Sequence, residues 1–398
     1  MRPILYQSPE ECCGCRACAN ICPKKAISFK EDKYGFLFPE IDESLCVECG
    51  RCKTVCAFQN SEKEYRRTPI KGYAAVLKDK KRLKHSASGG VFWSVAEWVI
   101  GKGGCVFGVV WDSEMNPIHT CAETMEQLAP MQGSKYVQSN VGDSYKRVVE
   151  ELSKDRWVLF TGSPCQVAAL RHYIGNRSCD KLITIDIVCH GVPNKAFFHS
   201  MLNSLEKRHN GKIVDFHFRH KNPDWLNGCL WVKFQSARKC FTKIIFNVEI
   251  PYFTMFNQKN QCCRQSCSIC KYATLQRVGD LTMGDFWGYE KIGIKLEFQM
   301  GLSCLLVNND KMFPILDESN IELQEVPIES ITAGNGQLKH PYYKDEKWDE
   351  VMETFAKGEY EKLEADYRKR NEKLLKRVQL HKLLPPKLLS VIRNVKNG

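Results

Sequence analysis

The feature that most constrains this chain is a cysteine motif that occurs twice within the first 60 residues. The motif has the spacing C-x2-C-x2-C-x3-C. It consists of Cys12, Cys15, Cys18 and Cys22 in its first copy and of Cys46, Cys49, Cys52 and Cys56 in its second. Three thiolates placed three residues apart can bind three corners of a four-iron cubane, and a short helical stretch carries the fourth onward. The motif therefore predicts two [4Fe–4S] clusters in a small, loop-rich domain.

The same motif assigns the ligands, because the fourth cysteine of each run ligates the other cluster. We expect one cluster at Cys12, Cys15, Cys18 and Cys56, and the second at Cys46, Cys49, Cys52 and Cys22. Cys13 is a spare thiol that the spacing does not use. A pair of zinc sites is the alternative, but zinc sites use two separated pairs of ligands rather than four cysteines in one run.

Length and composition place these clusters in a larger protein. A chain of 398 residues is too long for an electron carrier alone and indicates at least two domains. It has no apolar run long enough to span a bilayer and no secretory signal at its N-terminus. We therefore expect a cytoplasmic protein whose 21 cysteines stay reduced and bind metal instead of forming disulfides.

Beyond residue 60 the pattern changes to strand-like segments that alternate with helical ones, which predicts an α/β core with a largely parallel sheet. The alternation of β-branched and aromatic residues between Lys212 and Val248 predicts an antiparallel extension. The expected domains are an α+β ferredoxin-like domain over 1–60, a linker over 61–71, an α/β flavin-binding domain over 72–345, and a basic helical tail over 346–398.

A second cysteine motif, outside the N-terminal domain, consists of Cys263, Cys267 and Cys270. One interpretation is a third iron–sulfur cluster completed by Cys165, at a helix start whose dipole favours a thiolate, and by Cys189, at the end of a strand. The carboxyl ends of strands in an open α/β sheet meet at the ligand crevice. Cys165 and Cys189 could therefore join the second cysteine motif there. A structural zinc site and radical-SAM chemistry, which uses the same cysteine spacing, stay open as alternatives.

Six further motifs are distinctive when they occur together. They are Tyr34-Gly-Phe-Leu-Phe-Pro-Glu40, Ser86-Ala-Ser-Gly-Gly-Val91, Gly133-Ser-Lys-Tyr-Val-Gln-Ser139, Thr161-Gly-Ser-Pro-Cys-Gln166, Val188-Cys-His-Gly-Val-Pro193 and Gly284-Asp-Phe-Trp-Gly288. With the doubled cysteine motif, they make the chain resemble the coenzyme F420 hydrogenase/dehydrogenase beta-subunit family, in its form with a fused two-cluster ferredoxin domain. The resemblance covers residues 10 to 290.

The resemblance implies a flavoprotein that holds FAD in its α/β domain. The cofactor-binding residues it implies are Ser88, Gly89, Gly90, Ser134, Lys135, Tyr136, Thr161, Gly162 and Asp285. The residues are compatible with this role, since Ser88-Gly89-Gly90 precedes a predicted helix whose first N–H groups would attract a diphosphate, although a capped tight turn would have the same sequence. Asp285 could equally cap a turn. His190 is the candidate proton donor, with a purely local backbone contact as the alternative.

Family membership does not fix the substrate. Some relatives act on the deazaflavin F420, plant and cyanobacterial relatives reduce chlorophyll precursors, and bacterial relatives accompany genes for extracellular polysaccharides. We therefore expect an oxidoreductase dependent on FAD and iron–sulfur clusters, with an unidentified two-electron substrate and a redox donor such as a ferredoxin or a reduced coenzyme. The alternative is a non-catalytic electron-relay or docking subunit of a larger redox complex.

The net charge of +12 comes mostly from the C-terminal segment, where ten Lys or Arg residues follow Tyr367 and only Glu372 is acidic. The rest of the chain is near balance, which argues against a nucleic-acid partner. Leu374, Leu375 and Val378 share one helical face. The tail is therefore expected to be a solvated helix on the body of the protein, or an amphipathic helix that docks on an anionic membrane surface or a partner.

Overall fold

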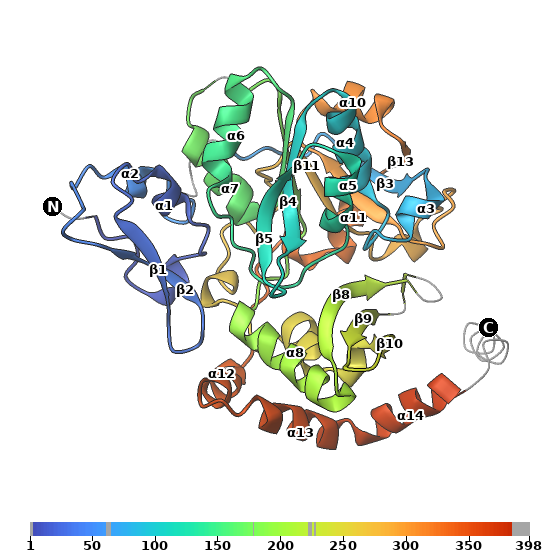
Figure 1. The fold of residues 1–398 in the computed structure, drawn as a ribbon. Helices are drawn as coiled ribbons and strands as arrows, with labels where there is room; N and C mark the ends of the chain where they lie inside the picture. Colours follow the sequence, from blue (N-terminus) through green and yellow to red (C-terminus); the bar gives the residue numbers. More distant parts are fainter. Residues whose placement is uncertain (1–2, 61–64, 178, 222–224, 227, 384–398) are drawn as a thin grey trace.

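The structure is a computed structural model that describes residues 3–60, 65–177, 179–221, 225–226 and 228–383. A large eight-stranded sheet with helices on both faces forms its upper part, a three-stranded sheet lies below, and the first 60 residues form a lobe at the side (Figure 1). The lobe contains the helices α1 (Ala17–Ile21) and α2 (Arg51–Thr54) and the antiparallel hairpin of β1 (Ile27–Glu31) and β2 (Leu37–Ile41). Each cysteine run therefore ends in a short helix.

The large sheet has the strand order β13-β3-β12-β11-β7-β6-β4-β5. Its centre is parallel, since β11, β7, β6 and β4 run in one direction, and antiparallel strands complete both sides. The strands are β3 (Lys71–Leu77), β4 (Cys105–Trp111), β5 (Pro117–Ala122), β6 (Val158–Gly162), β7 (Leu182–Ile187), β11 (Leu281–Asp285), β12 (Ser303–Val307) and β13 (Ile321–Val326). The prediction of an α/β core with a largely parallel sheet is confirmed at this level.

The central strands are mostly apolar because helices cover both faces of the sheet, with the buried Thr184 and Asp186 of β7 as polar exceptions. Val106 and Leu159 face the core beneath α4, whereas the neighbouring Phe107 and Phe160 face the core beneath α6 and α7. The helices of this part are α3 (Lys80–Leu83), α4 (Val91–Gly101), α5 (Met125–Leu128), α6 (Ser144–Ser153), α7 (Pro164–Ile174), α10 (Met312–Glu318) and α11 (Ile328–Gly334).

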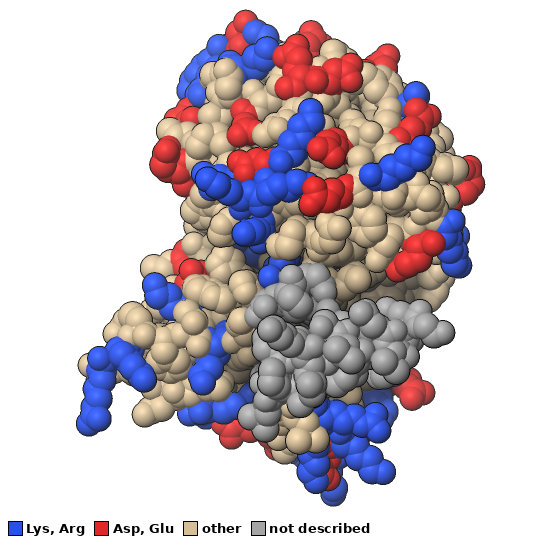
Figure 2. Space-filling model, turned by 90° about the vertical axis from the view of Figure 1, so that its right-hand side faces the viewer, with Lys and Arg blue, Asp and Glu red and all other residues tan. Residues whose placement is uncertain are grey.

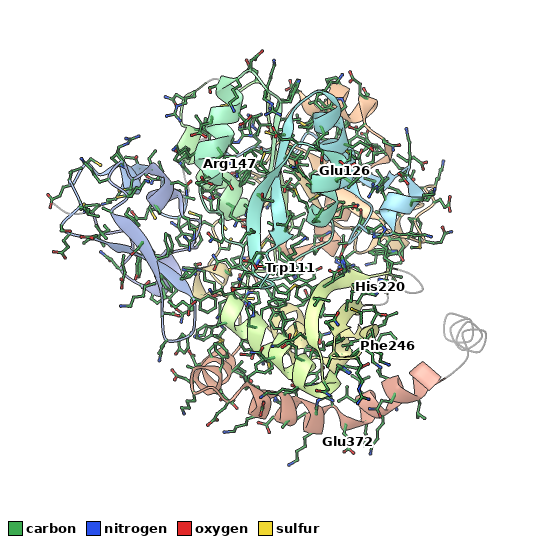
Figure 3. All side chains as sticks on the ribbon, in the orientation of Figure 1. Trp111, Glu126, Arg147, His220, Phe246 and Glu372 are labelled. Carbon is green, nitrogen blue, oxygen red and sulfur yellow. The ribbon has the colours of Figure 1, made fainter. Side chains whose placement is uncertain are left out.

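The predicted antiparallel extension forms, but as a sheet of its own. Its strands are β8 (Lys212–His220), β9 (Cys229–Gln235) and β10 (Cys240–Phe246), packed with α8 (Lys195–His209) and followed by the short α9 (Pro251–Phe253). Because β5 and β13 already occupy the edges of the large sheet, none of these strands pairs with it in the described part of the chain. Trp111, at the end of β4, connects the two sheets (Figure 3): its indole N–H donates to the Phe216 carbonyl over 3.1 Å.

Three helices close the described chain: α12 (Trp348–Ala356), α13 (Tyr360–Arg370) and α14 (Glu372–Leu383). Helices α12 and α13 pack on α8 and the small sheet through Trp348, Tyr360 and Leu363, so they belong to the body. Lys and Arg gather at the lower end of the face in Figure 2, where these helices lie. Pro385 and Pro386, expected to break the tail, lie outside the described residues. No helix in the described ranges is long and apolar enough to cross a membrane.

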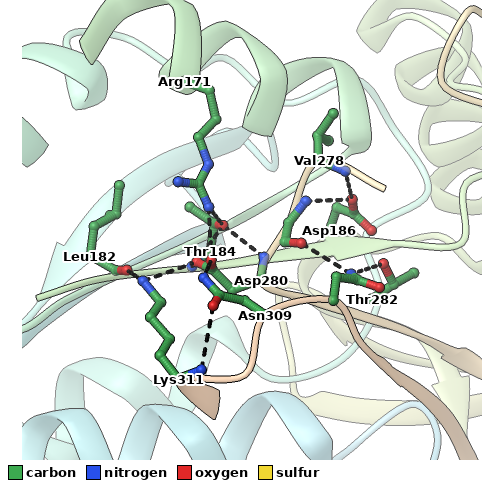
Figure 4. A network of polar contacts seen from close by, with 11 residues as sticks. Arg171, Leu182, Thr184, Asp186, Val278, Asp280, Thr282, Asn309 and Lys311 are labelled. Carbon is green, nitrogen blue, oxygen red and sulfur yellow. Dashed lines mark hydrogen bonds and ion pairs between the residues drawn. The ribbon is translucent and has the colours of Figure 1, made fainter. Parts of the chain in front are cut away.

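A buried polar network fixes the start of β11 against β7 (Figure 4). The Asp280 carboxylate is fully buried, contacts the Arg171 guanidinium at 3.0 Å and the Lys311 ammonium at 3.6 Å, and accepts hydrogen bonds from Thr184 and Asn309. Burial raises the pKa of this carboxyl, but the two cations and the hydrogen bonds outweigh burial and lower its pKa to about 2.

Asp280→Asn is expected to lower the free energy of unfolding by about 1.5–3 kcal/mol at neutral pH, since the charge-assisted hydrogen bonds weaken. The folded pKa lies below the value of about 3.9 in an unfolded chain, so this stabilisation is complete above pH 4 and is lost as pH falls from 4 towards 2. Urea denaturation of both proteins between pH 5 and 8 should show a constant difference. A difference that changes across this range would contradict the assignment.

Candidate metal centres and cofactor cavity

The first cysteine group comprises Cys12, Cys15, Cys18 and Cys56, as the motif predicts. Burial raises the pKa of the Cys18 thiol, and so do the neighbouring thiols of Cys15, Cys12 and Cys56, which shows that the four lie together. Buried thiols that oppose one another's ionisation become thiolates when a metal replaces their protons. This donor set therefore fits a cluster.

The first group faces the body of the protein. The Tyr145 hydroxyl, from α6, donates to the Cys15 carbonyl over 3.0 Å, and the Tyr272 hydroxyl donates to the Ala57 carbonyl. The Arg264 guanidinium donates to the Cys12 carbonyl over 2.6 Å. A cluster at this group would lie against the large sheet rather than at the outer end of the lobe.

The second group, Cys22, Cys46, Cys49 and Cys52, lines a small cavity at the outer end of the lobe. Cys49 is exposed, and Leu45 and Val47 beside it are 48% and 56% exposed. No three His, Cys, Asp or Glu side chains in the described ranges lie close enough to hold one metal ion together. In a cubane, however, each thiolate binds a different iron.

The other predicted cysteines come together behind the first group. Burial raises the pKa of the Cys267 thiol, and so do the neighbouring Cys189, Cys270 and Cys165. Cys165 lies at the start of α7, where Ser163 and Gln166 form a capping box. Hydrogen bonds with Cys13 and Ser163 lower the pKa of the Cys165 thiol to about 7, although burial opposes them.

Gly191 allows the segment after Cys189 to lie directly on the second cysteine motif. Its φ is +106°, and an added Cβ would lie 3.1 Å from the Cys263 sulfur and 3.2 Å from the Cys267 Cβ. A backbone bridge between Pro193 and Cys263 continues this contact. Strand β7 and the second motif are thus joined at the carboxyl end of the sheet.

A cavity of about 410 Å³ opens beside these cysteines, within the size range of small-molecule sites. Most of the predicted site residues line it: Ser88, Gly90, Ser134, Lys135, Tyr136, Thr161, Gly162, Cys165, Cys189, His190, Cys267, Cys270 and Asp285. Of the predicted residues outside the two N-terminal cysteine runs, Gly89 and Cys263 do not line it. Segments far apart in the sequence therefore share one cavity, as expected for the carboxyl edge of an α/β sheet.

The glycines before α4 are required by close packing. Gly90 has a φ of +84°, and a Cβ there would lie 2.8 Å from the Leu77 Cβ. A Cβ on Gly89 would lie 2.1 Å from the Ala75 carbonyl, so Gly89 packs on β3 instead of facing the cavity. No side chain caps α4, and the Ser88 hydroxyl donates to the Leu302 carbonyl over 2.7 Å. The start of α4 is thus held close to the cavity with its N-terminal end uncapped by any side chain.

Asp285, Arg219 and Tyr136 form a polar group in the cavity wall. An Arg219 N–H donates to the Asp285 carboxylate over 2.7 Å, and the same nitrogen lies 3.1 Å from the Tyr136 hydroxyl. Lys135 turns away, because its ammonium donates to the carbonyls of Pro130, Gln132 and Gly133, and burial lowers its pKa to about 7. Lys135 therefore braces its own loop and offers little positive charge to a ligand.

His190 lies on the same wall, with its ring centroid 6.1 Å from that of Tyr342. Its Nδ1 is buried and has no hydrogen-bond partner among the described residues. Burial lowers the pKa of His190, and the charge of Asp285 opposes this shift. The local backbone contact considered as an alternative role does not involve Nδ1.

Three residues of this region were not predicted from the sequence as parts of the site: Arg219, Arg264 and Cys13. The thiol of Cys13 lies beside the thiols of Cys15 in the first group and Cys165 at the cavity, and Cys13 itself lines the cavity. Cysteine spacing marked Cys13 as spare because it considers only one run at a time. The adjacency of Arg264 to Cys263 in the sequence was the one available signal for that arginine.

Two family models match parts of this chain. Residues 155–331 match the family model for the C terminus of the coenzyme F420 hydrogenase/dehydrogenase beta subunit, and residues 11–60 match a 4Fe-4S dicluster domain. A curated relative, "Ferredoxin 7Fe" of Hydrogenibacillus schlegelii, is 34% identical over 55 residues, which are 13% of this chain and 64% of that protein. The chain thus spans just under two thirds of the length of this relative.

Among solved structures, the chain is similar to one described as "Xenon derivatization of the F420-reducing [NiFe] hydrogenase complex from Methanosarcina barkeri", with 17% identity, a TM-score of 0.45, and coverage of 79% of this chain and 94% of that one. The predicted resemblance is confirmed by the two family models. The chain is therefore an iron–sulfur redox protein related to the coenzyme F420 hydrogenase/dehydrogenase beta subunit, whose C-terminal family model matches residues 155–331, and residues 11–60 match a 4Fe–4S dicluster domain.

Proposed function

We propose that this chain is an oxidoreductase that carries electrons between its N-terminal clusters and an FAD bound in the cavity, for an unidentified two-electron substrate. The observation that carries the proposal is Cys13, whose thiol contacts both Cys15 in the first group and Cys165 at the cavity wall. Iron–sulfur clusters supply one-electron transfer, and a flavin supplies the conversion between one-electron and two-electron chemistry. One side chain separates the two sites.

The flavin assignment rests on the end of the cavity at α4. Ser88 and Gly90 line it, and the first N–H groups of an uncapped helix are suited to a diphosphate. Further along the cavity, Phe253 and Phe256 contact Tyr136 and form an apolar wall. Phe256 lies in the π-helical turn over Thr254–Gln258, and Phe253 directly precedes it. An elongated ligand with one anionic part and one apolar part fits this lining.

The polar group supplies orientation and a proton. Arg219 is held by Asp285, so its guanidinium is fixed in direction towards the cavity wall. His190 is the proposed proton donor, because Nδ1 faces no protein partner while the ring lines the cavity. Thr161 and Gly162, from the end of β6, and Ser134 complete the lining between these residues and α7.

A third [4Fe–4S] cluster is part of the proposal, with Cys165, Cys189, Cys267 and Cys270 as its ligands. These four line the cavity and oppose one another's ionisation, whereas Cys263 lies outside the lining. They come from three separate segments, as in a site assembled at the edge of a sheet. We take Cys263 to be a packing residue beneath Gly191.

The second candidate function is that of a non-catalytic relay subunit in a larger redox complex. Helix α14 favours it, since Leu374 and Leu380 are 42% and 63% exposed beside Lys373, Lys376 and Arg377. For this function, the redox partner is a ferredoxin or a reduced coenzyme. The C-terminal helix binds, in addition, another subunit or a membrane surface. We place either version in the cytoplasm.

Anaerobic purification followed by iron, sulfide and flavin analysis separates the two functions. We expect about twelve irons per chain and stoichiometric FAD, reduced by dithionite-reduced ferredoxin in the isolated protein. Gly90→Ala should lose the flavin and keep the iron, because its Cβ would clash at a positive φ. Gly101→Ala is the matched control, since a Cβ there meets no atom within 4 Å. Full iron content without any flavin would contradict the enzyme and favour the relay subunit.

A further inference from the structure

Arg264 links the two metal-binding regions of the protein. It follows Cys263 in the sequence, yet its side chain extends into the first cysteine group, beside Cys12. The same guanidinium donates to the carbonyls of Cys12 and Leu37 over 2.6 and 2.8 Å, and to the Gln138 amide oxygen over 3.2 Å. Its position is therefore fixed from several sides.

The charge of Arg264 is buried without a carboxylate partner. Its residue is 1% exposed, and its guanidinium lies 4.3 Å from the centre of the Phe38 ring. The other buried arginine, Arg277, and the nearly buried Arg219 each pair with an aspartate, but no carboxylate in the described ranges pairs with Arg264. An isolated buried charge is strongly unfavourable, so a negative partner is required.

The first cluster is the partner that this geometry offers. Four thiolates outweigh the positive charge of the iron–sulfur core, so the assembled site is anionic and becomes more so when it is reduced. We propose that Arg264 is the counter-ion of the first cluster and raises its reduction potential above that of the second cluster. A fixed positive charge beside the cluster favours the reduced, more negative form.

Among the described residues, the second cluster has no equivalent of Arg264. The cations that line its cavity, Lys24 and Arg51, are both exposed, and water screens their charge. One electron would therefore move from the second site to the first with no bond made or broken, which directs electrons inward towards Cys13 and the cavity. The inference deepens the proposed function by giving the electron path a direction, and rests on it for the acceptor in the cavity.

The test is a redox titration of the anaerobically purified full chain, followed by electron paramagnetic resonance of the clusters. Arg264→Gln should lower the reduction potential of one N-terminal cluster by at least about 59 mV relative to that of the other. For a one-electron couple, this shift is a tenfold change in the equilibrium of the electron between the two clusters. Arg264→Lys keeps the charge and should retain more than half of the wild-type separation. Arg51→Gln, which removes an exposed cation beside the second group, is the matched control and should shift either potential by less than a third of that amount.

The following results would support or overturn the role of Arg264 as a counter-ion. An unchanged potential in Arg264→Gln with full iron content would overturn the proposal. If Arg264→Gln loses the cluster, the lysine variant decides: a retained cluster supports a counter-ion, and a lost one shows that only the shape of the arginine mattered. The titration needs neither flavin nor substrate, so it gives its answer even where the flavin analysis fails.

Discussion

Replacing Arg277 with leucine is expected to lower the free energy of unfolding by about 3–5 kcal/mol, because it leaves a fully buried aspartate without its counter-ion. Arg277 is 2% exposed and Asp186 is 0% exposed. Their ion pair is 2.8 Å long, and Arg277 also donates to the carbonyls of Tyr272, Thr274 and Ile187. The second carboxylate oxygen accepts from the backbone N–H groups of Val278 and Gly279, so the unpaired charge could not reach water.

The measurement is the midpoint of urea denaturation under anaerobic conditions, followed by circular dichroism. The double variant Arg277→Leu with Asp186→Leu should recover much of the loss, since two apolar side chains replace a buried pair more easily than one. Lys33→Leu is the matched control for an exposed pair: Lys33 and Glu353 lie 2.6 Å apart but are 64% and 45% exposed, and little change is expected. A midpoint for Arg277→Leu equal to that of the control would contradict the argument.

This pair also explains why the site holds its shape. Asp186 lies near the end of β7, three residues before Cys189, and Arg277 follows the second cysteine motif. Their contact therefore fixes two of the three segments of the cavity wall that carry proposed cluster ligands, those of Cys189 and of Cys267 and Cys270. Sequence spacing could not predict it, because the two residues are 91 positions apart and no local pattern pairs them.

Local patterns predicted what depends on local geometry. The doubled cysteine run predicted the composition of both N-terminal groups, because each run fixes the positions of its own thiols within one short turn. The alternation of strands and helices predicted the order of elements in the large sheet region, and hence which segments end at its carboxyl edge. The role predicted for Ser88-Gly89-Gly90 in binding a diphosphate stays a prediction, and in the structure Gly90 has a positive φ at the start of α4.

The remaining features depend on contacts between residues far apart in the sequence, which local patterns do not predict. Arg219 lies in a strand whose alternation gives no sign that one side chain faces a cavity of another sheet. The segment over 212–248 was expected to form an antiparallel extension, but it forms a separate sheet because the edges of the large sheet are occupied by β5 and β13. Gly89 and Cys263 belong to the predicted motifs but do not line the cavity, since Gly89 packs on β3 and Cys263 packs against Gly191.

Iron content is expected to distinguish the ligands of the proposed third cluster from their neighbours. Cys270→Ala should lower the iron from about twelve to about eight atoms per chain, because Cys270 lines the cavity with three other candidate thiols. Cys263→Ala is the matched control from the same motif and should keep about twelve, since Cys263 lies outside that lining. Both analyses are made on anaerobically purified protein with sulfide measured in parallel.

A nearby thiol can replace a lost ligand, and Cys263 is close enough to Cys267 to do so. The double variant Cys263→Ala with Cys270→Ala excludes this rescue and should retain about eight irons. Iron that falls in Cys263→Ala but not in Cys270→Ala would show that the ligand set is wrong. About eight irons in the unchanged protein, with zinc at the second motif, would show instead that these thiols hold a structural metal and that only the N-terminal lobe carries electrons.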